Sequence, residues 1–170
     1  MIYSQLNVRP TVETLTYLSE AMSGAPIDID LSSFKVEVIT TRDEVIPCPD
    51  NMYNATAINL KVWYDAYLQR SSLILSLESS DLQKRYLQLT QQGVVREWYS
   101  YYNPHLTLCK NAPESHRGRT FIYQTANVLC TAERPLQFTG EYLVNVDLHA
   151  PIDYEYNEAM AAERAYRRNY

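Results

Sequence analysis

The segment 102–108, YNPHLTL, contains the side chains that are the first candidates for catalysis. His105 and Thr107 are two positions apart, so on a β-strand their side chains would lie on the same face. An imidazole can move a proton near neutral pH, and a hydroxyl can hydrogen-bond a phosphate oxygen. Taken alone, an H-x-T triplet is also explained by a buried histidine whose hydrogen bonds are made with a neighbouring residue.

The sequence around this triplet resembles the second half of the two-histidine (2H, LigT-like) phosphoesterases. It has an apolar strand at 73–77, a helix that opens with S-x-x-Q at 80–83, an aromatic turn and then P-H-L-T at 104–107. It resembles most the phage-encoded anti-CBASS phosphodiesterases, a branch that destroys cyclic oligonucleotide alarm signals. The resemblance covers about residues 25–150. A late strand of that branch carries a glutamate near the site, and the similar segment here contains Glu141.

The family also has an upstream H-x-T strand, related to the second by a pseudo-twofold. The corresponding apolar frame here is FKVEV at 34–38, in which Lys35 stands at the histidine position and Glu37 at the threonine position. In the mechanism that the resemblance implies, one histidine takes a proton and the other gives one, while the threonines hold the phosphate. That mechanism needs no metal or other cofactor. Loss of one acid–base partner typically costs about 10² to 10⁴ in rate.

Lysine is a poor substitute for the missing histidine, because its reference pKa is about 10.4. Desolvation would lower the pKa of Lys35, and Glu37 on the same strand face would oppose that drop. We therefore expect an ion pair between Lys35 and Glu37. Two routes keep catalysis open: Glu37 acts as a general base, or His116 or His149 folds into the site.

These residues lead to two main hypotheses and leave open whether the protein is an enzyme, with the lost half-site weighing against it. The first is a protein that binds, or weakly cleaves, cyclic or short oligonucleotides, with Trp63, Tyr102 and Glu141 as further ligand contacts. The second is a catalytically dead 2H fold used as a structural or protein-interaction module, for example in a phage particle. A fully active phosphodiesterase ranks last.

Composition narrows the class of partner. The net charge of −5 argues against a surface that tracks duplex DNA. The 15 tyrosines, against 3 phenylalanines, suit core edges, base stacking or a protein interface. The three cysteines have no metal-like spacing and no signal-peptide pattern precedes them, so we expect reduced thiols in a cytoplasmic protein, in the host cell if it is phage-encoded. No apolar run is long enough to span a membrane.

Hydrophobic periodicity predicts an α+β fold. We expect helices at 11–22, 80–93 and 157–168, and strands at 33–40, 56–64, 73–77, 105–109 and 137–148, the last being one strand or a hairpin. Residues 111–119 read as a loop, and 120–130 fit either a helix or a strand. Several links between strands are too short for helical crossovers, which favours an antiparallel or mixed sheet. The resemblance implies a two-lobed sheet with flanking helices at 1–150, followed by a C-terminal helical extension at 151–170 that could dock a protein.

Overall fold

The computed structural model describes residues 2–26, 29–65, 69–97 and 102–147. The predicted helix at 157–168, the extension at 151–170 and His149 lie outside this range. In chain order the elements are β1 (Ile2–Pro10), α1 (Val12–Ala21), the short 3-10 helix η1 (Leu31–Ser33), β2 (Val36–Thr41), β3 (Met52–Asp65), β4 (Arg70–Glu78), α2 (Ser80–Gln91), β5 (His105–Cys109), α3 (His116–Thr131) and β6 (Leu136–Asp147).

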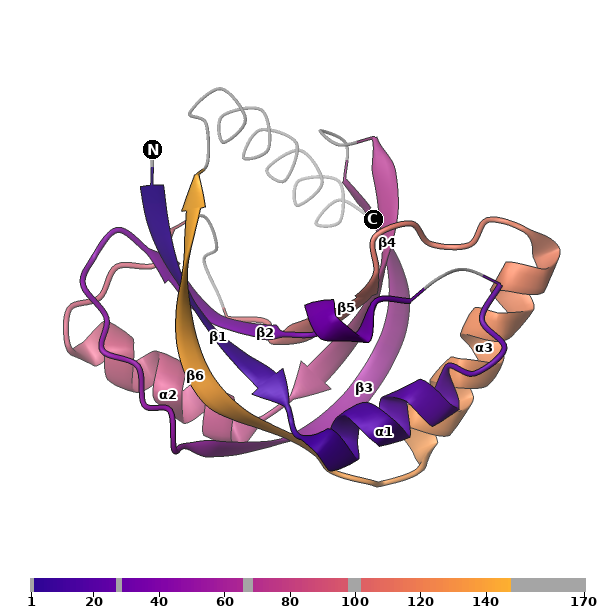
Figure 1. Ribbon diagram of the computed structural model, residues 1–170, viewed down its shortest axis with the longest axis horizontal. Coiled ribbons are helices and arrows are strands. Elements are labelled where there is room, and N and C mark those ends of the chain that lie inside the picture. Colours follow the sequence, from indigo (N-terminus) through magenta and orange to yellow (C-terminus); the bar gives the residue numbers. More distant parts are fainter. Residues whose placement is uncertain (1, 27–28, 66–68, 98–101, 148–170) are drawn as a thin grey trace, which may run out of the picture.

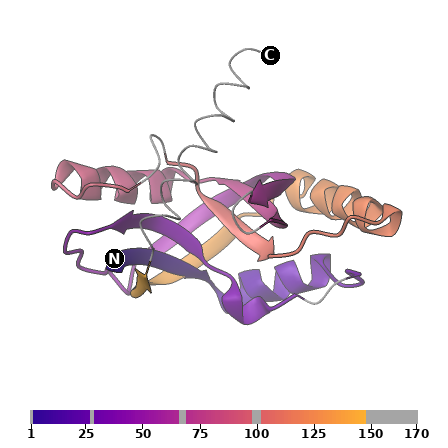
Figure 2. The same ribbon diagram turned by 90° about the horizontal axis from the view of Figure 1, so that it is seen from above.

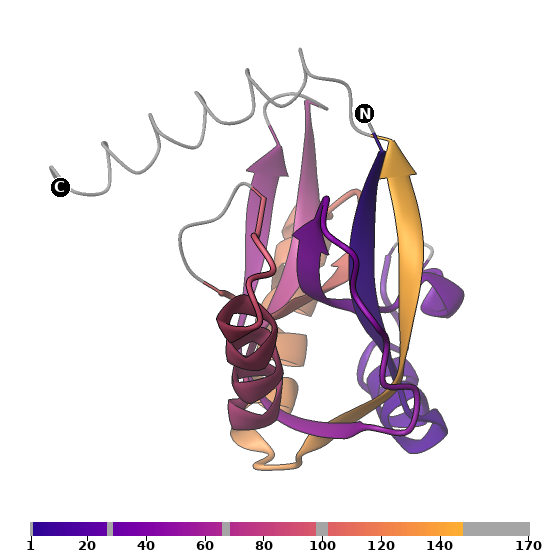
Figure 3. The ribbon, with the colours of Figure 1, turned by 90° about the vertical axis from the view of Figure 1, so that its left-hand side faces the viewer.

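The strands form an antiparallel sheet, which confirms the α+β class and decides against a mixed sheet for the described strands. Their order is β1-β2-β5-β4-β3-β6, and β6 pairs with both β1 and β3, so the sheet closes into a barrel. Figure 1 shows α2 on one side of the strands, and α1 and α3 on the other. Figures 2 and 3 show the same helices outside the strands and gathered around one end of them.

The core lies between the helices and one face of the strands. Leu18 of α1, Leu82 of α2 and Leu129 of α3 are buried in the same cluster as Val36 and Leu106. Because side chains alternate along a strand, the neighbours of these core residues point to the opposite face. That opposite face carries the candidate site.

The first strand, β1, has no counterpart among the predicted strands. Its side chains do not alternate cleanly, since Leu6, Asn7 and Val8 are all fully buried. Its register shifts against both partners at Asn7, and such irregularities disrupt the simple pattern of a half-buried strand. β1 is nevertheless central to the sheet, because it joins β2 to β6.

The prediction of a loop over 111–119 is wrong in its second half, because α3 already begins at His116. Ser115 caps the helix, its hydroxyl accepting from the amide of Gly118 at 3.0 Å. Gly118 is required for close packing, since a Cβ there would come within 2.3 Å of Pro113. Residues 120–130 are helical, and 137–147 form one strand rather than a hairpin. None of the described helices is long and apolar enough to cross a membrane.

The N-terminus of α2 lies one residue earlier than the S-x-x-Q pattern indicates. Ser79, not Ser80, is the cap: its hydroxyl accepts from the amide of Leu82 at 3.1 Å. The same hydroxyl donates to the carbonyl of Asn54 in β3 at 2.6 Å. A single buried hydroxyl thus both caps the helix and ties it to the sheet.

We predict that Ser79→Ala lowers the free energy of unfolding by about 1–2 kcal/mol, because it removes a helix cap. Ser80→Ala is the matched control. Ser80 is exposed, so its loss should change stability by less than about 0.5 kcal/mol. Urea denaturation followed by circular dichroism measures both. Equal losses for the two variants would contradict this assignment of the cap.

Candidate functional site

The pairing of β2 with β5 brings the two predicted half-sites together. Val36 lies opposite Leu106 in this antiparallel pair, and both are fully buried in the core. The residues on either side of them, Lys35 and Glu37 on one strand and His105 and Thr107 on the other, therefore lie on the opposite face. All four line one groove with a volume of about 880 Å³.

The groove contains further polar residues that the sequence reasoning missed. Arg70 of β4 and Lys110 after β5 add positive charge, while Gln5 and Asn7 of β1 and Tyr142 of β6 line the β1 side. Four of these residues come from strands other than β5, so no pattern local to the H-x-T segment marks them, while Lys110 lies only three positions after Thr107. With Lys35, the groove holds three cations and, in Asp30 and Glu37, two carboxylates. It is therefore a site of mixed charge.

His105 is held in an orientation that suits a general base. Its Nδ1 lies 2.9 Å from the carbonyl oxygen of Asn103. Because a carbonyl only accepts, the neutral ring must carry its proton on Nδ1, which leaves a lone pair on Nε2. Trp63 packs its ring edge-on against the imidazole, with centroids 5.5 Å apart. The structure thus brings the predicted Trp63 and His105 together.

The expected ion pair between Lys35 and Glu37 is wrong, because Gln5 lies between them. Lys35 Nζ donates to Gln5 Oε1 at 3.0 Å, and Gln5 Nε2 donates to Glu37 Oε2 at 3.3 Å. Thr40 also donates to Glu37 Oε1 at 2.9 Å. Desolvation lowers the pKa of Lys35, while Glu37 opposes the shift and Lys110 adds to it. A cross-strand amide thus separates two charges that strand alternation alone would pair.

Tyr102 does not line the groove but supports it from behind. Its hydroxyl donates to the backbone carbonyl of Glu37 at 3.0 Å. Its ring stacks on Tyr86, with centroids 4.7 Å apart and planes at 10°. Burial, and then the charge of Glu37, raise the pKa of Tyr102, so the phenol stays a protonated donor. This bond ties the segment before β5 to β2, where the two strands share the pair Val36–Leu106.

Glu141 lies away from the groove, in a buried network with Arg85 of α2. The Nη2 of Arg85 is 3.0 Å from Glu141 Oε1, and both side chains are almost fully buried. Tyr53 donates to the same carboxylate. Burial and this hydrogen bond raise the pKa of Tyr53, which keeps the phenol protonated.

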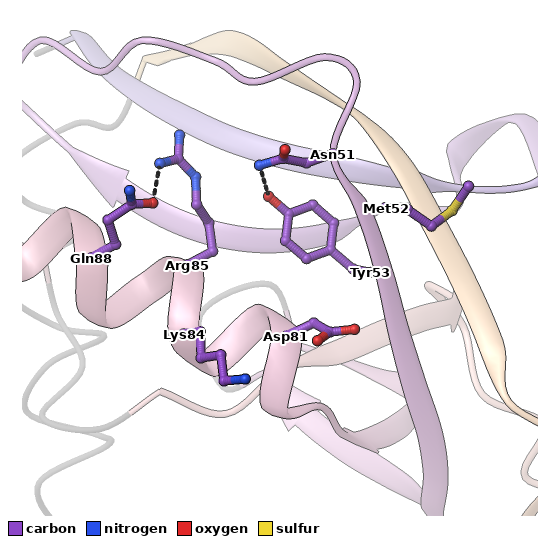
Figure 4. Close-up of a pocket in the computed structure, with 7 residues that line it drawn as sticks. All are labelled: Asn51, Met52, Tyr53, Asp81, Lys84, Arg85 and Gln88. Atoms are coloured by element: carbon purple, nitrogen blue, oxygen red, sulfur yellow. Dashed lines mark hydrogen bonds between the residues drawn. The ribbon is translucent and has the colours of Figure 1, made fainter.

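Arg85 also lines a second, shallower pocket of about 310 Å³ between α2 and the start of β3. Figure 4 shows its side chain beside Gln88, with Asn51 bonded to Tyr53 across the pocket. The guanidinium further donates to the carbonyl of Ile46 at 3.0 Å. The groups of this network are therefore occupied in holding α2 against the sheet.

The structure also places His116 and the three cysteines. His116 is exposed at the start of α3 and does not line the groove. Cys109 lines the groove, and Cys48, Cys109 and Cys130 are all free thiols. Within the described ranges, no three histidine, cysteine, aspartate or glutamate side chains are placed to hold a metal ion.

We predict that Glu141→Gln lowers the free energy of unfolding by about 3–5 kcal/mol, because it leaves the buried Arg85 without a counter-charge. The control is Glu20→Gln at an exposed position of α1, which should change stability by less than about 0.5 kcal/mol. Chemical denaturation measures both variants. A Glu141→Gln protein of unchanged stability would argue against this structural role and for a role in binding.

Comparison with known proteins identifies one family. Residues 2–153 match the family described as anti-CBASS protein Acb1. The matched segment is most of the chain and includes every described strand and helix, and therefore both halves of the groove. A comparison with curated proteins finds no match.

Proposed function

Because the chain belongs to the anti-CBASS protein Acb1 family, we propose that it has a phage anti-CBASS role and binds cyclic or short oligonucleotides in this groove. The fold we propose is that of a 2H phosphoesterase with one intact half-site, His105 and Thr107. The observation that carries the proposal is that these two residues share one groove with Lys35 and Glu37, the predicted counterparts of the missing half-site.

The register of β2 and β5 supports the 2H assignment. With Val36 opposite Leu106, a local twofold axis through this antiparallel pair exchanges Lys35 with His105 and Glu37 with Thr107. This is the relation expected of two H-x-T strands that act on one phosphate from both sides.

The intact half supplies binding and one proton-transfer group. The Thr107 hydroxyl can donate to a phosphate oxygen, and Lys110 and Arg70 provide positive charge along the groove. The Nε2 of His105 can take a proton from an attacking hydroxyl or water. The residue that would give a proton to the leaving oxygen is Lys35 in place of an imidazole, and an ammonium is a weaker acid than an imidazolium. Lys35 also donates to Gln5. We therefore expect binding with slow or no cleavage.

A second candidate is an inactive 2H fold that serves as a structural or protein-interaction module. The observation that favours it is the carboxylate of Glu37, held by Gln5 and Thr40 where a phosphate would otherwise lie. The volume of the groove, about 880 Å³, lies in the range of ligand pockets and favours ligand binding instead. Nucleotide titration separates the two.

We predict that isothermal titration calorimetry detects binding of at least one ligand from a panel of cyclic di- and trinucleotides. Chromatography of the same mixtures should show slow or no cleavage. His105→Ala should weaken binding about tenfold or more, because it removes the imidazole whose Nε2, in the protonated ring, donates to a phosphate oxygen. His116→Ala is the matched control: it removes an exposed histidine outside the groove and should leave the affinity unchanged.

Two outcomes would contradict the proposal. If no ligand of the panel produced heat, the protein would be better explained as an interaction module. If a ligand bound equally well to wild type and to His105→Ala, its site would lie outside this groove.

A further inference from the structure

One side of the groove contains a buried hydrogen-bond acceptor without a partner. Asn7 is fully buried and lines the groove, and its Oδ1 has no hydrogen-bond partner. Its Nδ2 donates to the carbonyl of Gln5 at 3.3 Å, which fixes the amide so that the oxygen is the free end. A buried acceptor left unpaired destabilises a fold, so such groups need an explanation.

Asn7 lies beside two other residues that line the groove. Asn7 lies opposite Glu37 where β1 pairs with β2, and opposite Tyr142 where β1 pairs with β6. Paired residues lie on the same face of a sheet, so a carboxylate, an amide oxygen and an aromatic ring form one row along the groove. Neighbouring side chains in such a row are about 5 Å apart, which makes the row on the order of 10 Å long. A purine base is of similar length.

The two sides of the groove therefore differ in what they can recognise. His105 and Thr107, with the cations Arg70 and Lys110, suit a phosphate. Glu37 and Asn7 present acceptors, which repel a phosphate and attract N–H donors. Thr40 donates a hydrogen bond to one carboxylate oxygen of Glu37, and Gln5 donates one to the other. A carboxylate has about four lone-pair sites, so each oxygen can still accept from a ligand.

Building on the proposed function, we propose that Glu37 and Asn7 form a nucleobase subsite that selects guanine, while the phosphate binds at His105 and Thr107. Guanine is the common base with two neighbouring N–H donors on its Watson–Crick edge, N1–H and the 2-amino group. The carboxylate of Glu37 accepts from both, and Asn7 Oδ1 accepts the remaining amino proton. Adenine places a ring acceptor at N1, which faces the carboxylate unfavourably. On this proposal Glu37, which stands at the position of a phosphate-binding threonine, contributes to the choice of base.

The test compares three ligands with the same sugar–phosphate ring: cyclic di-GMP, cyclic di-AMP and cyclic di-IMP, which lacks the 2-amino group. We expect wild type to bind cyclic di-GMP about tenfold or more tighter than cyclic di-AMP, with cyclic di-IMP between them, because hydrogen bonds to a charged group discriminate strongly. Glu37→Gln and Asn7→Leu should each reduce the guanine preference at least severalfold.

Matched controls are Glu20→Gln and Asn127→Leu, which make the same changes at exposed positions of α1 and α3 and should keep the preference. Urea unfolding checks that Asn7→Leu is folded, as expected for the removal of an unpaired buried acceptor. Equal affinity for the guanine and adenine ligands, or a preference that survives both Glu37→Gln and Asn7→Leu, would overturn this inference and leave the proposed function standing. Failure of all three ligands to bind wild type would overturn this inference, and the proposed function would fall with it if the cyclic trinucleotides also failed to bind.

Discussion

The site depends on one constraint, the register in which β2 and β5 pair. With Val36 opposite Leu106 and both in the core, strand alternation sends Lys35, Glu37, His105 and Thr107 to the groove. A slip of one strand by one residue would turn its two site residues, Lys35 and Glu37 or His105 and Thr107, into the core and break the site. One contact from the segment before β5 supports this register, because the hydroxyl of Tyr102 donates to the backbone carbonyl of Glu37 in β2. A second contact ties the same segment to β4, since the amide of Leu77 donates to the carbonyl of Pro104.

The groove that results is chemically asymmetric. Around His105 it offers a hydroxyl and positive charge, which suit a phosphate, and an imidazole nitrogen that can take a proton from an attacking group. Around Glu37 it offers acceptors, with Lys35 drawn into hydrogen bonding by Gln5. An ancestral site that worked from both sides of one phosphate would, on this account, have kept its grip on the phosphate and given up one proton-transfer group. Its second half would then contribute selectivity instead of rate.

The sequence predicts the part of the site that depends on the spacing of residues within one strand. His105 and Thr107 follow from an i, i+2 pattern on a clear strand, and Lys35 and Glu37 from the matching upstream frame. Gln5 and Asn7 could not be predicted, because β1 buries three consecutive residues and so lacks a period of two. The pairing of Glu141 with Arg85 joins residues 56 positions apart, and no local pattern encodes it. The ion pair expected for Lys35 failed for the same reason, since its partner, Gln5, comes from another strand.

The most direct test of the central claim is to restore the missing half-site and measure cleavage. The double variant Lys35→His/Glu37→Thr rebuilds an H-x-T strand opposite His105 and Thr107. Single-turnover cleavage of a cyclic oligonucleotide that wild type binds should then become faster by about 10² to 10⁴, the usual contribution of one acid–base group. Wild type should show little turnover. If the folded double variant bound the ligand but cleaved it no faster than wild type, the lost half-site would not be what limits catalysis, and the account would be wrong.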